Sequence, residues 1–301
     1  MEKVINIEKI NSKLNDYTLF DIETTGLSRT KDFMYMFGIC EKKYNKLIFT
    51  QYYIEDENEE KKLILKINNL LKEKEIISYN GDRFDFPFIR KKANKYNISL
   101  CDFKNIDIYR EFQKLNFFLN EKSLKAINLG KRLGLDVHDY VNQNEMPKVF
   151  KMYQKIKDKE ILSKLIYHNY IDLKVLSNIY EYKTSILDNI LTIKNKKFIG
   201  KIKNIYIQKN YLIIKLSNLK NKSLNFNDFN YSIEANNDEI KIKLELKSVF
   251  LKNNENIKLF KFSKYKNKIF KDSSIFKENY ILICKNNILI KENLLLLATL
   301  L

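Results

Sequence analysis

The sequence predicts an α/β domain built on a central sheet with flanking helices, followed by a smaller domain rich in β-strands. Within residues 1–190, short apolar segments alternate with helical segments, which is typical of a sheet covered by helices. Within residues 191–301, apolar and charged residues alternate one by one in places, which indicates strands with one buried face. No Pro-rich or Gly-rich linker marks the change, so the boundary near residue 190 is approximate.

Local patterns place the elements of the first domain in order. Apolar runs predict strands at four positions: residues 17–22, 33–40, 47–53 and 76–79. Helical patterns predict helices at three positions: about residues 59–73, 84–95 and 159–182. From Ser123 onward the first domain is mostly helical, and a further short strand is expected around Asp107.

The second domain is predicted mainly from alternation. In residues 240–247, Ile240, Ile242 and Leu244 alternate with lysine and glutamate, so one face of the strand is apolar and the other is charged. Four more runs predict strands: residues 202–207, 211–216, 258–262 and 280–284.

The chain is strongly basic, and most of the excess charge lies in the second domain. Of 301 residues, 55 are Lys or Arg and 37 are Asp or Glu, which gives a formal net charge of +18. Residues 191–301 contain 22 lysines and 9 acidic residues, a net charge of +13. Such a surplus is typical of proteins that bind a polyanion. Only five of the cations are arginines, and Asn and Ile are abundant, so drift in an A/T-rich genome remains an alternative explanation.

Composition also limits the class of protein. With 45% hydrophobic residues the chain can bury a large core, which excludes wholesale disorder. No apolar run approaches the roughly 18 residues of a membrane-spanning helix, and the N-terminus lacks the pattern of a signal peptide. The three cysteines lie far apart, which argues against a disulfide or zinc framework. We therefore expect a cytoplasmic protein without a membrane partner.

The strongest local feature is a pair of acids at the end of the first predicted strand. Asp21 and Glu23 stand two residues apart, so their side chains point to the same side of the strand, about 7 Å apart. Such a pair can be two solvated strand-end acids. The apolar residues before them indicate a buried central strand, where unpaired acids are costly, and this favours a metal site.

Two further motifs carry acids on predicted helices. Asp85 lies near the start of a helix in Asn80-Gly81-Asp82-Arg83-Phe84-Asp85-Phe86-Pro87, where an acid also interacts favourably with the helix dipole. His168 and Asp172 are four residues apart on the long helix and share a face. Taken alone, each motif also suits a structural role, as a capping acid or as a His–Asp ion pair.

Together these motifs resemble the DEDD, or DnaQ-like, superfamily of 3′–5′ exonucleases, whose ribonuclease-H-like fold has a mixed central sheet flanked by helices. The Asn-Gly-x-x-Phe-Asp-x-Pro form of the second motif is similar to proofreading domains of family B polymerases. It is most similar to the bacterial YprB-like stand-alone exonucleases. Four further segments also fit that pattern: Ser123-Leu124-Lys125, Leu133-Gly134, His168-Asn169-x-x-Asp172 and Ile106-Asp107-Ile108. The resemblance covers roughly residues 15–185.

The resemblance implies a set of site residues and a cofactor. It implies two divalent ions, Mg²⁺ or Mn²⁺, bound by four carboxylates: Asp21, Glu23, Asp85 and Asp172. Hard cations of this kind prefer carboxylate oxygens, and paired ions suit phosphodiester cleavage. The resemblance also implies four residues beside the terminal nucleotide: Thr24, Gly26, Leu27 and Asn80.

A further residue must position or deprotonate the attacking water. The superfamily places a Tyr four residues before the last Asp or a His five residues before it. This sequence has His168 at minus four and Tyr167 at minus five, which matches neither spacing. The YprB-like pattern tolerates a His at minus four, so we assign the role to His168, with Tyr167 as the alternative.

The resulting hypothesis is a metal-dependent 3′–5′ exonuclease that acts on ends of single-stranded DNA or RNA. The second domain would contribute backbone contacts, and aromatics interleave with lysines in residues 260–266, which suits either nucleic-acid binding or an edge strand. A structure-specific endonuclease of the same fold and a catalytically silent nucleic-acid-binding protein remain alternatives. Asp107 is expected to be a hydrogen-bonded acid, and His138 a residue of a solvated turn.

Overall fold

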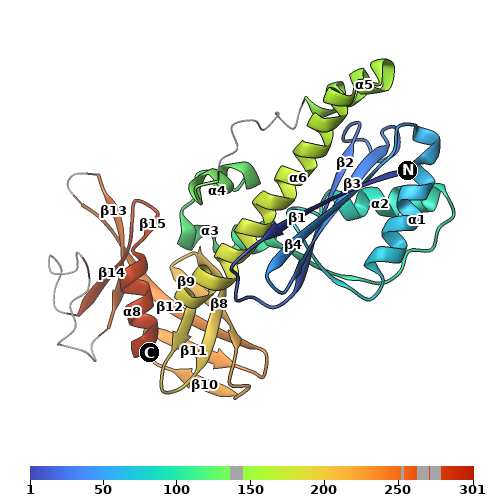
Figure 1. Cartoon of the computed structure of the whole chain (residues 1–301). Coiled ribbons are helices and arrows are strands. Elements are labelled where there is room, and N and C mark those ends of the chain that lie inside the picture. The colour runs from blue at the N-terminus through green and yellow to red at the C-terminus, as the bar shows by residue number, and fades with distance from the viewer. Residues whose placement is uncertain (136–144, 252–253, 263–270, 272–278) are drawn as a thin grey trace. The chain divides into compact units, whose positions relative to one another are not determined.

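The computed structural model describes residues 1–135, 145–251, 254–262, 271 and 279–301 (Figure 1). The chain forms two compact units. The first contains Met1–Arg110 and Ser123–Ser185, and the second contains Glu111–Lys122 and Ile186–Leu301. The domain boundary near residue 190 stays a prediction. The position of residues 111–122 in the second unit has no counterpart in the sequence analysis.

The first unit is built on a six-stranded mixed sheet in the order β1-β4-β3-β2-β5-β6. Its strands are β1 (Glu2–Lys9), β2 (Tyr17–Thr24), β3 (Met34–Lys43), β4 (Lys46–Tyr53), β5 (Glu75–Ser78) and β6 (Lys104–Asp107). β1 to β4 pair antiparallel, whereas β5 and β6 run parallel to β2. This confirms the predicted mixed sheet. The sequence analysis missed β1, an edge strand whose Ile5 and Ile7 are exposed, because its alternation does not mark a buried face.

Helices flank this sheet. In chain order they are α1 (Glu60–Leu71), α2 (Asp85–Lys95), α4 (Ala126–Arg132), α5 (Met146–Ile156) and α6 (Lys159–Tyr182), with a 3₁₀ turn at Glu57–Glu59. α6 begins at the N-cap Asp158, whose side chain accepts hydrogen bonds from two backbone N–H groups of the first turn. The long helix therefore begins and ends where its sequence pattern predicts.

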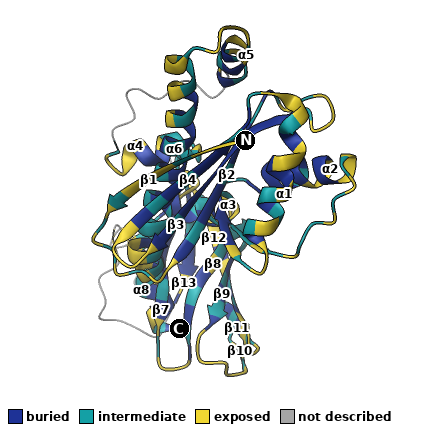
Figure 2. Ribbon diagram, turned by 45° about the vertical axis from the view of Figure 1, so that its right-hand side comes forward, coloured by how far each residue is buried: buried dark blue, intermediate teal, exposed yellow. Residues whose placement is uncertain are grey.

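The two faces of the sheet pack against different helices. On one face, Phe20 of β2 stacks on Phe86 of α2, and Lys66 of α1 lies over the ring of Tyr52. The opposite face carries Asp21 and Gly38, and it packs against α6. β2 and β3 are consequently buried along nearly their whole length (Figure 2).

A buried carboxylate ties α1 and α2 to the sheet. Glu60, at the start of α1, accepts hydrogen bonds from the backbone N–H of Met34 at 2.8 Å and from the Tyr96 hydroxyl at 2.7 Å. The ammonium group of Lys92 lies 3.5 Å from the same carboxylate, and both side chains are buried. Because a buried ion pair is stable only when both partners remain, this contact holds α2 in a defined position.

The second unit is dominated by a nine-stranded antiparallel sheet. Its main order is β15-β14-β13-β12-β9-β8-β7, and β11 joins it at β12 and carries β10. The strands are β7 (Thr192–Lys194), β8 (Ile199–Gln208), β9 (Tyr211–Asn218), β10 (Leu224–Asn227), β11 (Tyr231–Ala235), β12 (Glu239–Phe250), β13 (Asn256–Lys261), β14 (Tyr280–Lys285) and β15 (Ile288–Leu289). Three helices accompany them: α3 (Ile108–Leu119, from residue 111 onward), α7 (Asp188–Ile190) and α8 (Lys291–Leu300). This confirms the predicted β-rich second part.

A π-helical segment, Lys183–Leu187, lies between α6 and α7. In the part of the chain that the structure describes, no helix is both long enough and apolar enough to cross a membrane.

Candidate metal and active site

The odd-numbered face of β2 holds the two acids of the first motif. Asp21 and Glu23 both lie on this inner strand, and Glu23 is only 7% exposed. The amide nitrogen of Asn169, from α6, donates a hydrogen bond to Asp21 Oδ2 at 2.8 Å. β2 therefore presents two carboxylates to α6 within the interior of the first unit.

Asp85 is the first residue of α2 and is also buried. Its Oδ1 accepts a hydrogen bond from the backbone N–H of Ile22 at 3.2 Å. This bond joins the start of α2 to β2 between the two acids of that strand. Pro87 lies in the first turn, where a missing N–H leaves no helical hydrogen bond unmade.

His168 and Asp172 come from α6. The imidazole Nε2 of His168 lies 3.4 Å from Asp172 Oδ2 and 3.9 Å from Glu23 Oε1. One ligand atom from each of Glu23, His168 and Asp172 lies within 4.8 Å of the other two. His168 is 1% exposed, whereas the Asp172 side chain is 20% exposed, so solvent reaches this cluster at Asp172.

The environment disfavours charge on these carboxylates. Burial raises the pKa of Asp21 and of Glu23 well above the ordinary range, and the neighbouring Asp172 carboxylate raises both further. Burial also raises the pKa of Asp85 to about 7 and lowers that of His168 to about 4. Together these residues offer several carboxylate oxygens and one imidazole nitrogen. This donor set fits a hard divalent cation, whose positive charge would offset the repulsion between the acids.

The residues after β2 form a turn. The Thr24 hydroxyl donates a hydrogen bond to the carbonyl of Gly26 at 2.8 Å. A Cβ on Gly26 would lie 2.5 Å from the Asp32 carboxylate, so a side chain fits there only if Asp32 moves. Leu27 is 82% exposed. Of these residues, Leu27 thus presents a large apolar side chain to solvent beside the strand that carries Asp21 and Glu23.

Asn80 lies in the turn before α2 and adopts a left-handed backbone conformation, with φ of 65°. Its backbone N–H donates to Asp107 Oδ1 at 2.9 Å, and the N–H of Asp82 donates to Asp107 Oδ2 at 3.2 Å. Asp107 is buried at the end of β6. This confirms the hydrogen-bonded acid that the sequence predicts there, and it shows how the turn leading to Asp85 is held.

Tyr167 occupies a different environment from its neighbour His168. It is 44% exposed, and its ring lies beside that of Tyr170, with 6.0 Å between ring centroids. Two other predicted features lie wholly or partly outside the described residues. His138 is not described, and of residues 260–266 only 260–262 are.

Two residues that the sequence patterns did not select also lie at this cluster, Gly38 on β3 and Gln51 on β4, together with Asn169 on α6, which the resemblance included only as part of His168-Asn169-x-x-Asp172. Gln51 and Asn169 are fully buried. A glutamine inside the apolar strand that contains Phe49 and Tyr52 was the available signal, because a buried amide needs partners.

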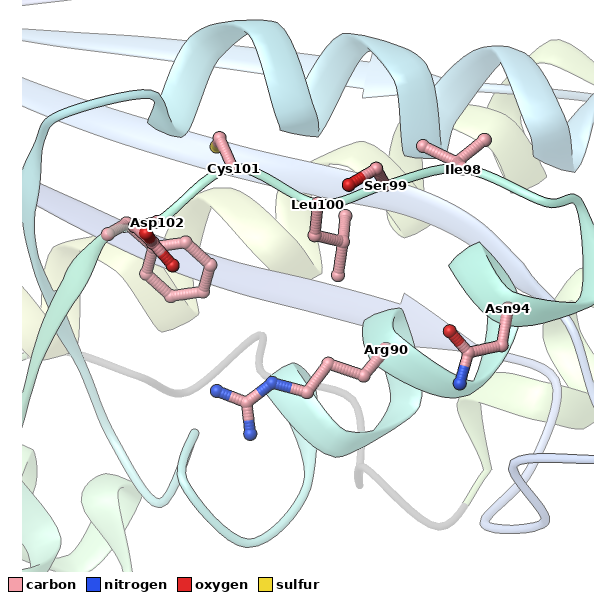
Figure 3. Close-up of a pocket in the computed structure, with 8 residues that line it drawn as sticks. Arg90, Asn94, Ile98, Ser99, Leu100, Cys101 and Asp102 are labelled. Carbon is pink, nitrogen blue, oxygen red and sulfur yellow. The ribbon is translucent and has the colours of Figure 1, made fainter.

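A separate cavity of about 400 Å³ lies in the first unit between α2 and residues 98–103 (Figure 3). Arg90 and Asn94 of α2 line it together with Ser99 and Asp102. None of the predicted site residues lines this cavity, and we assign it no role.

Several known proteins are similar to parts of this chain. A DNA polymerase III of PolC type from Ureaplasma parvum is 24% identical over 228 residues, which span 68% of this chain and 15% of that protein. A DNA polymerase from Methanocaldococcus jannaschii is 34% identical over 101 residues, or 32% of this chain and 6% of that protein. This chain therefore spans only a small part of these polymerases.

Two solved structures are also similar. The family B DNA polymerase of Pyrobaculum calidifontis has a TM-score of 0.44 and 14% identity, over 58% of this chain and 25% of that one. Exonuclease I of E. coli in complex with a dT13 oligonucleotide has a TM-score of 0.38 and 12% identity, over 67% and 55% of the two chains. The sequence profile of the RNase H superfamily matches residues 18–184. Because this match covers more than half of the chain and contains every residue of the acidic cluster, the chain belongs to the RNase H superfamily.

Proposed function

We propose that the protein is a metal-dependent nuclease that hydrolyses phosphodiester bonds at the 3′ ends of single-stranded DNA or RNA. The observation that carries this proposal is the convergence of four buried or half-buried carboxylates from β2, α2 and α6, two of which, Glu23 and Asp172, lie beside the buried His168. Membership of the RNase H superfamily and sequence similarity to DNA polymerases support it. We further propose a cytoplasmic enzyme of the YprB-like group, on the motifs described above.

In this proposal Asp21, Glu23, Asp85 and Asp172 hold two divalent ions, Mg²⁺ or Mn²⁺. When bound, such ions lower the pKa of a coordinated water and stabilise negative charge on phosphate oxygens. The chain itself supplies oxygen ligands that are held on rigid elements. Burial keeps most bulk water away from these ligands. Thr24, Gly26, Leu27 and Asn80 are proposed to line the path of the terminal nucleotide.

His168 is proposed to accept the proton of the attacking water. Its pKa of about 4 keeps the imidazole neutral near pH 7, so a ring nitrogen is available as an acceptor. Its position 3.4 Å from Asp172 favours this role, because the carboxylate would stabilise the imidazolium that forms. Tyr167, by contrast, is 44% exposed, and its ring contacts that of Tyr170.

Loss of a single carboxylate should abolish cleavage. Asp21→Asn and Asp172→Asn are each expected to lower the rate by about a thousandfold, because each removes several kcal/mol of metal-dependent stabilisation. The measurement is Mg²⁺- or Mn²⁺-dependent degradation of end-labelled oligonucleotides, DNA and RNA in parallel. Asp102→Asn, which alters an exposed acid of the same unit, is the matched control and should cleave like wild type.

The same assay separates the alternatives. Oligonucleotides with a blocked 3′ end should resist the enzyme, and their cleavage would favour an endonuclease instead. A wild-type protein that binds oligonucleotides but cleaves none with either metal would identify a silent binding protein and refute the proposed activity.

His168→Gln should lower kcat by about 10²- to 10⁴-fold with little change in substrate affinity, as expected for loss of a general base. Tyr167→Phe should leave kcat within a few-fold of wild type, because this side chain points partly into solvent. Single-turnover cleavage at saturating metal gives both values. The reverse ranking of the two variants would transfer the role to Tyr167.

Without metal, Asp85 should contribute less to stability as pH rises from about 4 to 7. Burial raises the folded-state pKa of Asp85 to about 7, whereas an aspartate in an unfolded chain titrates near 3.9. Between these values the folded state binds more protons than the unfolded state. The contribution of Asp85 to the free energy of unfolding should therefore fall with rising pH, by roughly 1 to 4 kcal/mol. Burial lowers the pKa of His168 to about 4, and this group contributes with the opposite sign, so the test is the difference between wild type and Asp85→Asn. Urea unfolding in EDTA between pH 4 and pH 8 measures the slope.

Asp85→Asn is the comparison for this pH dependence, because it removes the Asp85 carboxyl while His168, Asp21 and Glu23 remain. The slope of its free energy of unfolding against pH should be more positive than that of wild type. Addition of Mn²⁺ at pH 7.5 should stabilise wild type and have a smaller effect on the variant. Equal slopes for the two proteins would show that Asp85 does not titrate as its burial implies.

The lysines of β12 should contribute to substrate binding through backbone phosphates. Lys241, Lys243 and Lys247 lie on the charged face of this strand, and Lys243 stands 3.9 Å from the centroid of the Tyr211 ring. The triple Lys→Gln variant should reduce the slope of log affinity against log salt by about 2, because each phosphate neutralised on a single strand contributes about 0.7 to that slope.

Fluorescence anisotropy with a labelled oligonucleotide in EDTA, between low and moderate salt, measures this slope. A triple Lys→Gln change at the exposed residues Lys61, Lys72 and Lys91 of the first unit removes the same charge and serves as the control. If the β12 variant and the control give the same slope, the basic character of β12 reflects composition alone.

A further inference from the structure

A row of three residues crosses the sheet beneath the acidic cluster. Asp21 of β2 stands opposite Gly38 of β3, and Gly38 stands opposite Gln51 of β4. The three positions therefore share one face, with a glycine between two polar side chains. A Cβ at Gly38 would lie 2.1 Å from Asn169 Oδ1 and 2.6 Å from Leu173 Cδ1. Only glycine leaves room for the Asn169 side chain between Asp21 and Gln51.

Asn169 bridges this row with hydrogen bonds whose direction is determined. Gln51 Nε2 donates to the backbone carbonyl of Ile166 at 2.7 Å and to Asn169 Oδ1 at 3.1 Å. A carbonyl can only accept, so Ile166 sets which end of the Gln51 amide faces α6. Because the Gln51 nitrogen donates to Asn169 Oδ1, the Asn169 oxygen faces β4. The Asn169 nitrogen is then left to donate to Asp21.

Packing alone does not account for two amides at this place. Gln51 and Asn169 are both 0% exposed, and burial of an amide costs free energy unless its polar atoms are satisfied. Gln51 Oε1 is buried and has no hydrogen-bond partner among the described residues. An apolar pair of similar size would avoid that cost, so the amides indicate a requirement other than stability.

We propose that Asn169, oriented by Gln51 and accommodated by Gly38, is a positioning residue that aims the Asp21 carboxylate at the divalent cation. This inference rests on the proposed function, because it assigns Asp21 to a metal. A neutral amide stabilises the carboxylate without placing a positive charge beside it. Lysine or arginine at the same position would compete with the cation for Asp21, whereas asparagine restrains the carboxylate and leaves its charge available.

Metal affinity is the direct test. Asn169→Leu retains a side chain of similar size and removes the donor, so Mn²⁺ binding should weaken by about 10- to 100-fold, as is usual when a ligand loses its supporting hydrogen bond. Ser177→Ala is the matched control. It removes a buried hydrogen bond on the same helix, to Tyr17 of β2, away from the acids, and should bind Mn²⁺ like wild type. Calorimetry, or EPR of free Mn²⁺, gives the dissociation constants.

Three further variants test how Gln51 and Gly38 orient Asn169. Gln51→Leu should weaken Mn²⁺ binding less than Asn169→Leu does, because the Asn169 amide is still present and only its orientation is lost. Gln51→Glu should weaken binding more than Gln51→Leu, since a carboxylate accepts from the Asn169 nitrogen and draws it away from Asp21. Gly38→Ala should act like Asn169→Leu, because the new methyl group displaces Asn169.

Cleavage kinetics and unfolding separate positioning from general damage. The Mn²⁺ concentration for half-maximal cleavage should rise in Asn169→Leu, while kcat at saturating Mn²⁺ stays within a few-fold of wild type. Unfolding in EDTA should show both Asn169→Leu and Gln51→Leu folded; if one variant does not fold, the other decides the question. If the folded variants bind Mn²⁺ with wild-type affinity, the positioning role of Asn169 is overturned, whereas the proposed function is not affected. A wild-type protein that does not bind Mn²⁺ would overturn both the proposed function and the positioning role of Asn169.

Discussion

Electrostatic repulsion between buried carboxylates is the constraint on which the rest of the first unit depends. Asp21, Glu23 and Asp85 lie in an environment that disfavours their charged forms, and each is also close to another acid. Such an arrangement separates or becomes protonated unless the backbone that carries it is rigid and a cation compensates the charge. The two inner strands and the long helix α6 supply that rigidity, since their apolar residues are buried along most of their length.

Three of the four acids are attached to this framework by separate contacts. The backbone of Ile22 binds Asp85, Asn169 binds Asp21, and His168 stands beside Asp172. A second layer holds the elements themselves. Glu60 joins α1 and α2 to β3, and Asp107 holds the turn that precedes α2. Glu60 and Asp107 therefore help to fix the position of the elements that carry the acidic cluster.

Much of the fold followed from local patterns. The strands of the central sheet, apart from β1, and the helices α1, α2 and α6 agree with their predicted ranges to within a few residues, because each has a strong apolar periodicity. β1 was missed because an exposed edge strand need not alternate. Residues 111–122 belong to the second unit although they lie between segments of the first, and this depends on contacts between residues far apart in the chain.

The residues of the site also fall into two groups, those selected from the sequence and those that only the tertiary structure brings together. Strand and helix periodicity place Asp21 with Glu23, and His168 with Asp172, on one face before any packing is known. The selection of Asp85, and of the four carboxylates as one metal-binding set, came from the resemblance of the combined motifs to the DEDD exonucleases. Only the tertiary structure brings Gly38, Gln51 and Asn169 together, since their contact depends on the register of three strands and on where α6 crosses them. Tertiary structure also distinguishes His168 from Tyr167, which adjoin in sequence. The rotation of α6 buries the first beside Asp172 and exposes the second. A sequence determines which chemical groups are available and their local periodicity, whereas burial and distance, which determine pKa and metal affinity, arise only when separate elements pack.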